Sequence, residues 1–461
     1  MLKIVNPATE EIIRELETYS PPLVAEKYQR ASVAQKDWAR VSLEERLGAI
    51  RKFRELVVAR TEKLAAITTS EVGKPITQSR NELNGLLGRI DFFLENTARV
   101  LCDETVFSDR SQKLEEKISY EPLGVIGNIS AWNYPYFVGS NVFIPALLAG
   151  NAVLYKPSEF ASLTGLAIAE LLQEAGIPKD VFIPVIGAGQ VGAELLQQPL
   201  AGIFFTGSYA TGQKISEAAA KRLMKVQLEL GGKDPIYVAD DVDVRLAAES
   251  VADGAFYNCG QSCCAVERIY VHEKIYDAFI EAFVQTVKNF IIGDPLDEKT
   301  YIGPVARREH LVVLERQVND ALEKGAKLLC GGKRGSRRGF YFGPTVFGNV
   351  NHSMELMREE TFGPMIGIQK VSGDEEAFQL MADTSYGLTA GVYSKSRERA
   401  TRILSQINAG SVYWNCCDRV SPRLPWSGRG HSGIGTTLST LGIQTFVQPK
   451  AWHLRGPNLT L

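Results

Sequence analysis

One cysteine of the chain stands in a context that suits covalent catalysis. Cys263 lies in the small polar run NCGQSCC, residues 258–264, which separates a predicted helix from a predicted strand. A thiolate attacks a carbonyl carbon readily, and the covalent adduct then needs hydrogen-bond donors aimed at its oxygen. No histidine lies nearby in the sequence, which disfavours a cysteine–histidine pair and leaves a carboxylate as the expected base. The alternative is an inert buried thiol, the commoner role of a cysteine.

Glu229 is the candidate for that carboxylate. It lies in the run VQLEL, residues 226–230, and a charge within an apolar strand is costly unless it is paired or functional. Withdrawal from water would raise the pKa of this carboxyl group, which suits a group that transfers protons. Periodicity equally allows this side of the strand to face solvent.

Two glycine-rich turns follow predicted strands and could accept a phosphate. Residues 206–212 (TGSYATG) lead into a helix, and glycines at such a turn let a phosphate approach free helix-end amides. Residues 187–192 (GAGQVG) match the common dinucleotide spacing better, but no acidic residue follows about 20 positions later, where Phe205 and Thr206 stand. We therefore interpret the second motif as a decoy, and the first as a nucleotide site or a turn that uses glycine only for its geometry.

Lys156 and Glu159 belong to the tetrapeptide KPSE, which directly follows a predicted strand. The carboxyl ends of parallel strands collect ligands, so Lys156 could hold ribose hydroxyls or a phosphate. Glu159 could accept hydrogen bonds from a ribose diol, and its charge would repel a 2′-phosphate, which favours NAD over NADP. The alternative is a helix-entry turn with capping residues.

The elements that must position these residues alternate between strands and helices. Residues 24–99 have the three- and four-residue apolar spacing of helices. Short β-branched runs then alternate with helical stretches, and the pattern resumes beyond residue 235 after the glycines of residues 231–232, where we place a boundary. The first four predicted strands cover residues 125–129, 152–155, 181–186 and 202–205. We expect an α/β fold with a doubly wound parallel sheet and a second α/β unit.

Composition excludes several classes of protein. The 461 residues suffice for two or three units at about 150 residues each. The chain has 51 Lys plus Arg against 53 Asp plus Glu, so no excess positive charge exists to bind nucleic acid. Residues 136–155 are too often interrupted for a bilayer span, and the first residues lack a secretory signal, so a cytoplasmic protein without a membrane partner is expected. Seven cysteines and five scattered histidines indicate free thiols and no metal site.

Taken together, these residues resemble the aldehyde dehydrogenase superfamily over essentially the whole chain. The segments that carry the resemblance are residues 121–127 (EPLGVIG), 132–135 (WNYP), 156–159 (KPSE), 205–208 (FTGS), 228–233 (LELGGK), 258–263 (NCGQSC) with Arg268, and 359–364 (EETFGP). The resemblance implies that the Cys263 thiolate attacks an aldehyde while the Asn133 amide and the Cys263 N–H stabilise the oxyanion. After hydride transfer to NAD(P)+, Glu229 would activate water to hydrolyse the thioester and release a carboxylic acid.

The resemblance also implies cofactor contacts. Lys156 and Glu159 would hold the adenosine ribose, Ser208 and its turn the pyrophosphate, and Glu360 the nicotinamide ribose beside Phe362. The complete set of expected cofactor residues is Ile129, Trp132, Lys156, Ser158, Glu159, Gly207, Ser208, Gly212, Leu230, Glu360 and Phe362. NAD is the favoured cofactor because of Glu159, and NADP is the alternative.

Family architecture further implies three parts and an oligomer. Residues 1–100 and 121–230 would form the NAD(P)-binding domain, residues 231–435 the catalytic domain, and residues 101–120 and 436–461 an oligomerisation element. A homodimer or homotetramer is expected.

Predictions about the substrate and about regulation depend on a few individual residues. Betaine aldehyde dehydrogenases place an aromatic residue where this chain has Asn141, which argues against that substrate and for a more polar wall. Arg419 and Arg423 could bind a carboxylate, as in succinate semialdehyde, or could be surface charges. Cys259 or Cys264 could form a reversible disulfide with Cys263.

Rival functions have their own signatures. A CoA-acylating dehydrogenase would lack the hydrolytic glutamate, a silent binding or structural homologue would lose the catalytic set, and a cysteine hydrolase would turn over esters without oxidising aldehydes. Glu229, Asn133 and Cys263 are all present, so a hydrolytic dehydrogenase is favoured.

Overall fold

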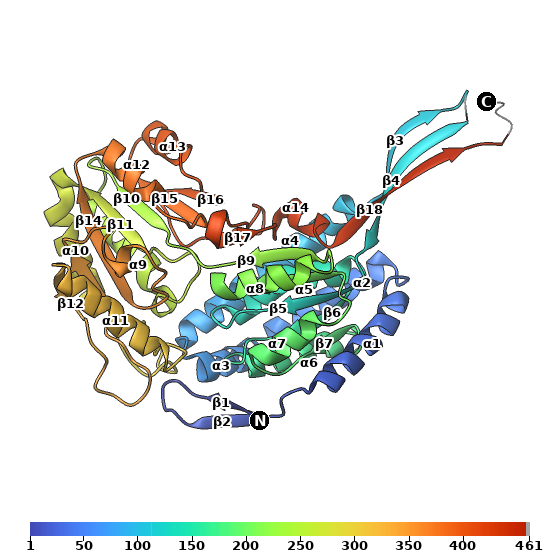
Figure 1. Cartoon of the computed structure of the whole chain (residues 1–461), viewed down its shortest axis with the longest axis horizontal. Coiled ribbons are helices and arrows are strands. Elements are labelled where there is room, and N and C mark those ends of the chain that lie inside the picture. Colours follow the sequence, from blue (N-terminus) through green and yellow to red (C-terminus); the bar gives the residue numbers. More distant parts are fainter. Residues whose placement is uncertain (112, 458–461) are drawn as a thin grey trace.

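The chain folds around two large sheets that form the cores of two lobes. The computed structural model describes residues 1–111 and 113–457, and within this part a third, smaller sheet projects from one lobe (Figure 1). The expected α/β architecture with a small β element is confirmed.

The first sheet is a doubly wound parallel sheet. Its strands lie in the order β9-β8-β5-β6-β7, and the short β17 (Gly433–Ile434) pairs antiparallel with the outer edge of β9. The parallel strands are β5 (Val125–Ile129), β6 (Ala152–Lys156), β7 (Phe182–Pro184), β8 (Gly202–Thr206) and β9 (Lys225–Glu229). The strand order reverses between β5 and β8, and such a switch point is where parallel sheets bind ligands at their carboxyl ends.

Helices cover both faces of this sheet. One face carries α1 (Pro21–Trp38), α7 (Gly189–Leu196) and α8 (Tyr209–Ala220). The opposite face carries α2 (Leu43–Ala59), α3 (Thr61–Val72), α4 (Ile76–Val100), α5 (Pro135–Leu148), α6 (Ser162–Glu174) and α14 (Ser439–Gln444). The predicted helical region of residues 24–99 is thus four helices, and α5 is buried along almost its whole length.

The second sheet follows after residues 230–234 and is parallel except for one strand. Its order is β12-β13-β14-β11-β10-β15-β16, with β12 antiparallel to β13. The strands are β10 (Pro235–Val238), β11 (Arg268–His272), β12 (Lys327–Cys330), β13 (Thr345–Gly348), β14 (Met365–Val371), β15 (Thr389–Tyr393) and β16 (Ser411–Trp414). The helices of this lobe are α9 (Val244–Phe256), α10 (Tyr276–Lys288), α11 (His310–Glu323), α12 (Asp374–Ala382) and α13 (Arg397–Leu404).

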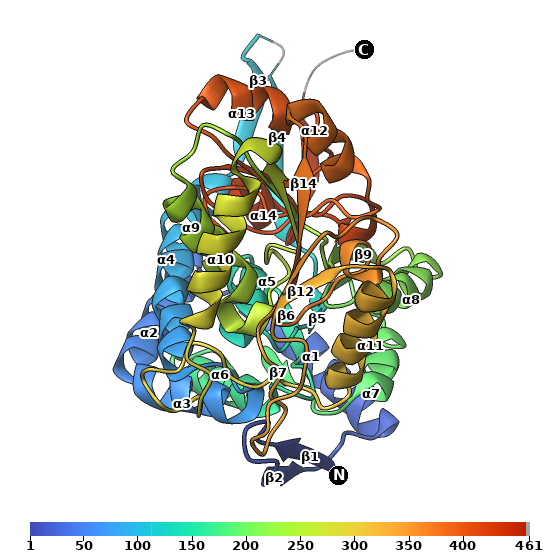
Figure 2. The same cartoon turned by 90° about the vertical axis from the view of Figure 1, so that its left-hand side faces the viewer.

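Two antiparallel elements lie on opposite sides of the molecule, one at the top and one at the bottom of both views (Figures 1 and 2). The projecting sheet contains β3 (Glu104–Asp109), β4 (Leu114–Pro122) and β18 (Val447–Arg455) in the order β18-β4-β3. Residues 112 and 458–461 of the predicted oligomerisation element lie outside the described residues. At the other end, β1 (Leu2–Val5) pairs with β2 (Ile12–Leu16).

Two observations bear on earlier expectations. The strand predicted for residues 181–186 is shorter in the structure, where β7 covers Phe182–Pro184. Hydrogen bonds to β6 still reach one residue beyond each end, from the Val153 N–H to the Val181 carbonyl and from the Val185 N–H to the Tyr155 carbonyl. Across the described residues, no helix is both long enough and apolar enough to cross a bilayer.

Candidate active site

The loop that carries Cys263 is held in an unusual backbone conformation. Asn258, Cys259 and Gly260, in the turn after α9, all have left-handed φ values of 51°, 58° and 69°. The Asn258 side-chain amide donates to the carbonyl oxygens of Asn133 and Gln261, both at 3.1 Å. A Cβ atom at Gly260 would lie 2.2 Å from the Gly363 carbonyl oxygen, so glycine is required there. This framework fixes Cys263, which is half-buried and lines two cavities.

Asn133 is bound to the same loop. It lies in the turn between β5 and α5, it is buried, and its Nδ2 donates to the Gln261 carbonyl oxygen at 3.1 Å. An amide nitrogen carries two hydrogens, so a second donor remains beside Cys263 in the cavity that both residues line.

Glu229 is the last residue of β9 and is buried, with 5% of its surface exposed. The alternative that this side of the strand faces solvent is therefore wrong. Burial raises the pKa of the carboxyl group to about 7, although a hydrogen bond from the Thr437 hydroxyl and the charge of Arg89 oppose this rise. The contact with Thr437 exists because β17 pairs with β9, with Gly433 opposite Glu229. A carboxyl group with this pKa exchanges protons near neutral pH.

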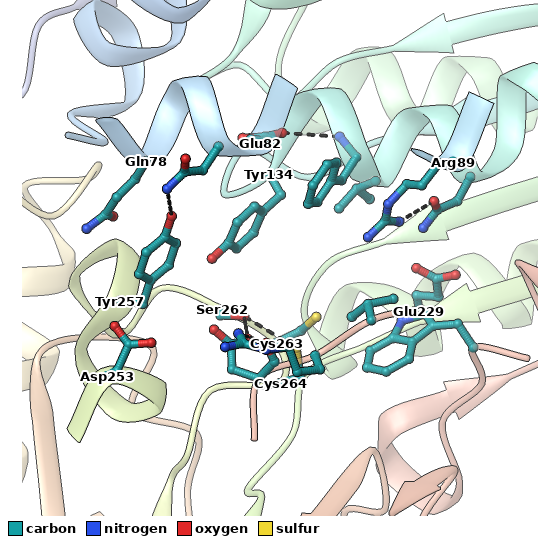
Figure 3. A pocket seen from close by; sticks show the side chains of 18 residues that line it. Gln78, Glu82, Arg89, Tyr134, Glu229, Asp253, Tyr257, Ser262, Cys263 and Cys264 are labelled. Atoms are coloured by element: carbon teal, nitrogen blue, oxygen red, sulfur yellow. Dashed lines mark hydrogen bonds between the residues drawn. The ribbon is translucent and has the colours of Figure 1, made fainter. Parts of the chain in front are cut away.

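Three cavities share walls around these residues. The Tyr134 cavity, of about 400 Å³, is lined by Tyr134 together with Cys263 and Glu229 (Figure 3). The Phe362 cavity, of about 220 Å³, also has Cys263 and Glu229 in its wall. The Lys156 cavity, of about 460 Å³, lies at the carboxyl ends of β5, β6 and β8. Residues that line both the Phe362 and the Lys156 cavities are Ala131, Trp132, Thr206, Gly207, Ser208 and Arg307.

The structure brings almost all of the expected cofactor residues into these walls. The Lys156 cavity contains Ile129, Trp132, Lys156, Ser158, Glu159, Gly207 and Ser208. The Phe362 cavity contains Leu230, Glu360 and Phe362, again with Trp132, Gly207 and Ser208. Gly212, on α8, lines neither cavity. It packs against the Leu230 side chain, since a Cβ atom at this position would lie 2.6 Å from a Leu230 methyl carbon. Gly189 and Gly192, from the motif interpreted as a decoy, also line the Lys156 cavity.

Charged groups in the Lys156 and Phe362 cavities have defined partners. Lys156 Nζ lies 3.8 Å from a carboxylate oxygen of Glu159, and burial lowers the lysine's pKa. Glu360 accepts a hydrogen bond from the Gly232 N–H at 3.0 Å, and burial raises its pKa to about 8. The Phe362 ring packs edge-on against Trp132 with centroids 5.5 Å apart.

Sequence reasoning missed three residues of this site. Arg307 lies over the rings of Trp132 and Phe160, and its buried Nε has no hydrogen-bond partner. Arg89 is buried in the wall of the Tyr134 cavity, and Thr437 donates to Glu229. Only Arg89 had a readable signal, a charge within the apolar stripe of the helix over residues 76–100.

Other expected positions are placed as follows. Asn141 and Arg419 line the Tyr134 cavity, whereas Arg423 is exposed and lies outside its wall. Cys259 and Cys264 are buried free thiols, and Cys264 Sγ contacts an Asp418 carboxylate oxygen at 3.1 Å. In the described part of the chain, no group of three or more His, Cys, Asp or Glu side chains could hold a metal ion.

Residues 1–452 match the model of the Aldehyde dehydrogenase family. The chain belongs to this family. The protein is accordingly an oxidoreductase that acts on aldehydes and has an NAD-binding fold.

Relatives of this aldehyde dehydrogenase carry several names. It is 36% identical to "Aminoaldehyde dehydrogenase 1, peroxisomal" of Malus domestica, over 97% of this chain and 91% of that protein. It is 33% identical to "Betaine aldehyde dehydrogenase" of Bacillus subtilis, over 97% and 92%.

Solved structures share its fold. Betaine aldehyde dehydrogenase from Staphylococcus aureus in complex with NAD+ superposes with a TM-score of 0.95 at 31% identity, covering 100% of this chain and 92% of that one. An NAD-dependent aldehyde dehydrogenase from Sinorhizobium meliloti gives a TM-score of 0.96 at 35% identity, with coverage of 100% and 92%.

Proposed function

We propose that this enzyme oxidises a small aldehyde to the carboxylic acid with NAD+, through a thioester on Cys263 that water hydrolyses. The observation that carries the proposal is that Cys263 and Glu229 are the side chains in the walls of both the Tyr134 and the Phe362 cavities. An aldehyde in the first cavity and a nicotinamide in the second would meet at the nucleophile and the base.

The residues suit successive steps of this reaction. The Cys263 thiolate attacks the aldehyde carbon and forms a thiohemiacetal, whose oxyanion accepts hydrogen bonds from Asn133 Nδ2 and the Cys263 N–H. When bound, NAD+ supplies the hydride acceptor that converts the adduct to a thioester. Glu229 then takes a proton from water, which attacks the thioester, releases the acid and restores the thiolate. A carboxyl group with a pKa of about 7 takes up this proton readily.

The two cofactor-side cavities fit a dinucleotide. Their shared wall contains Arg307, the charged residue of that wall, whose buried Nε is unpartnered and can bind a pyrophosphate. We propose that Lys156 and Glu159, in the wall of the Lys156 cavity, hold the adenosine ribose, and that Glu360 and Phe362, in the wall of the Phe362 cavity, contact the nicotinamide riboside. Because the Glu159 carboxylate would repel a 2′-phosphate, we propose NAD as the preferred cofactor and NADP as the weaker one.

The projecting sheet supports association between copies of this chain. β3 and β18 are its edge strands, and unpaired edges can extend by pairing with another strand. We propose a homodimer or homotetramer through residues 101–120 and the C-terminal strand, with residues 1–100 and 121–230 as the cofactor domain and 231–435 as the catalytic domain. Sedimentation of the enzyme, with and without Pro substitutions in β18, measures this association.

Reduction of NAD+ at 340 nm tests the proposed reaction. Wild type should oxidise aldehydes without CoA, and Cys263→Ala should have no activity while it still binds NAD+. Glu229→Gln should release one equivalent of NADH quickly and then stall, because acylation precedes the step that needs the base. Equal turnover by Cys263→Ala, or a strict requirement for CoA, would refute the mechanism.

A further inference from the structure

Arg89 places a buried positive charge in the wall of the Tyr134 cavity. It lies on α4, only 4% of its surface is exposed, and it shares the cavity with Cys263 and Glu229. Figure 3 shows its guanidinium on the same side of the cavity as Glu229, and Asp253 and Tyr257 on the opposite side.

The bonding of this guanidinium is incomplete. Nη1 donates to Asn141 Oδ1 at 2.5 Å, and the group lies 4.0 Å from the ring centroid of Phe137. A guanidinium has five N–H donors in a planar fork. Across residues 1–111 and 113–457, no carboxylate forms an ion pair with Arg89, and Asn141 is the acceptor that the structure gives it.

The nearby carboxylates are already engaged. Glu82 forms an ion pair with Lys74 at 2.5 Å and caps the start of α5 by accepting the N–H groups of Tyr136 and Phe137. Glu229 accepts the Thr437 hydroxyl. On the far side of the cavity, Asp253 accepts a hydrogen bond from Tyr301, and Asp418 accepts one from Ser262.

Among the described residues, Arg89 therefore has a neutral hydrogen-bond acceptor in Asn141 but no carboxylate in an ion pair with it. Burial lowers its pKa to about 10, which leaves it protonated at neutral pH. A buried charge without an ion-pair partner is costly for the fold, and a ligand carboxylate would offset that cost. Its position beside the nucleophile means that a bound aldehyde would meet it.

We propose that Arg89 binds a carboxylate of the substrate, so that the enzyme acts on short aldehydes that carry an acid group. This inference rests on the proposed aldehyde oxidation. The planar fork suits a carboxylate, because two parallel N–H groups can donate to its two oxygens, and Asn141 holds the guanidinium in place. Beside Arg89 the same charge repels an ammonium group, whereas the Asp253 carboxylate lies on the opposite side of the cavity. The relatives described above are named as amino and betaine aldehyde dehydrogenases. The carboxylate-binding role considered for Arg419 and Arg423 thus passes to Arg89.

Three four-carbon aldehydes of matched length test the proposal. They are succinate semialdehyde, butyraldehyde and 4-aminobutyraldehyde, which differ in the charge of the far end. Wild type should show kcat/KM for the acid at least about 50-fold above the neutral aldehyde, with the cation lowest. Arg89→Met should lower the acid-to-neutral ratio about 100-fold. The charge of Arg89 also influences the pKa of Glu229, but succinate semialdehyde and butyraldehyde need the same base. The ratio of their kcat/KM values therefore cancels this influence.

Controls separate the outcomes. Arg419→Met, which removes an exposed arginine from the same wall, should change the ratio less than about threefold; a loss there instead would move the role to Arg419. Equal losses for all three aldehydes in Arg89→Met would indicate a structural role and overturn the inference. If that variant does not fold, inhibition of wild type decides: succinate should compete with the aldehyde and butylamine should not.

Failure of the proposed aldehyde oxidation can be told apart from failure of the role proposed for Arg89. Wild type that reduces no NAD+ with any aldehyde would refute aldehyde oxidation itself. Activity that is equal for butyraldehyde and the acid would refute only the role of Arg89.

Discussion

The hydrogen bond from Thr437 to Glu229 should set the pH at which thioester hydrolysis begins. Thr437→Val removes the hydroxyl that donates to the Glu229 carboxylate and nearly preserves the side-chain shape. This donor stabilises the ionised form of Glu229, whereas burial favours the neutral form. Loss of the donor therefore raises the pKa of Glu229 further.

The size of the shift follows from the energy of the bond. A hydrogen bond to a charged group contributes about 1.5–3 kcal/mol, and one pKa unit corresponds to about 1.36 kcal/mol, so the pKa should rise by about 1–2 units. From a starting value of about 7, the ionised fraction at pH 7 falls from about one half to between about one tenth and one hundredth. Hydrolysis should slow about 5- to 50-fold at pH 7 and recover above pH 9 or so.

Single-turnover kinetics measures this directly. The thioester is allowed to accumulate with excess NAD+, and the rate of its decay is measured between pH 6 and pH 10. The rising limb of a plot of this rate against pH gives the pKa of Glu229. Thr436→Val is the matched control, because the hydroxyl bonded to Glu229 belongs to Thr437, and the Thr436 carbonyl accepts a hydrogen bond from Thr445 instead; this variant should leave the limb in place. An unchanged limb in Thr437→Val, or an equal shift in both variants, would refute the reasoning.

Three further outcomes are expected. Glu159→Gln should raise the ratio of kcat/KM for NADP to that for NAD about 10-fold, and an unchanged ratio would remove Glu159 from cofactor choice. Arg307→Met should weaken NAD+ binding at least about 10-fold in titration calorimetry while adenosine binding is retained; the adjacent, exposed Arg308→Met is its control, and equal loss for both ligands would contradict a pyrophosphate contact. Glu267→Ala should lower the free energy of unfolding by about 3–5 kcal/mol in urea titrations, because Lys233, 2.5 Å away, is left charged and buried, and a loss below 1 kcal/mol or so would contradict this.

The sequence predicts local features of the site well. Glu229 stands out as a charge in an apolar strand, and Lys156 and Glu159 directly follow a strand in a region that alternates with helices. Because the carboxyl ends of parallel strands meet at one edge of a sheet, such residues converge without knowledge of the packing. The alternation of strand-like and helix-like runs also predicted a doubly wound parallel sheet followed by a second α/β unit.

Long-range partners could not be predicted in this way. Thr437 reaches Glu229 across 208 positions, and Arg89 reaches Asn141 across 52. These contacts depend on how β17 returns to β9 and how α4 crosses α5, which are properties of tertiary packing. The ends of β7 differ from the prediction by one or two residues, because its hydrogen bonds to β6 reach Val181 and Val185 while the regular strand covers Phe182–Pro184 only.

The return of β17 to β9 also has a consequence during synthesis of the chain. A ribosome that adds about 5–20 residues per second needs roughly 10–40 s to make the 208 residues between Glu229 and Thr437. Throughout this interval the first sheet has an open β9 edge, which can pair with a wrong strand. The nascent first lobe is therefore both catalytically incomplete and exposed to misassembly until the second lobe has been translated and the chain has crossed back.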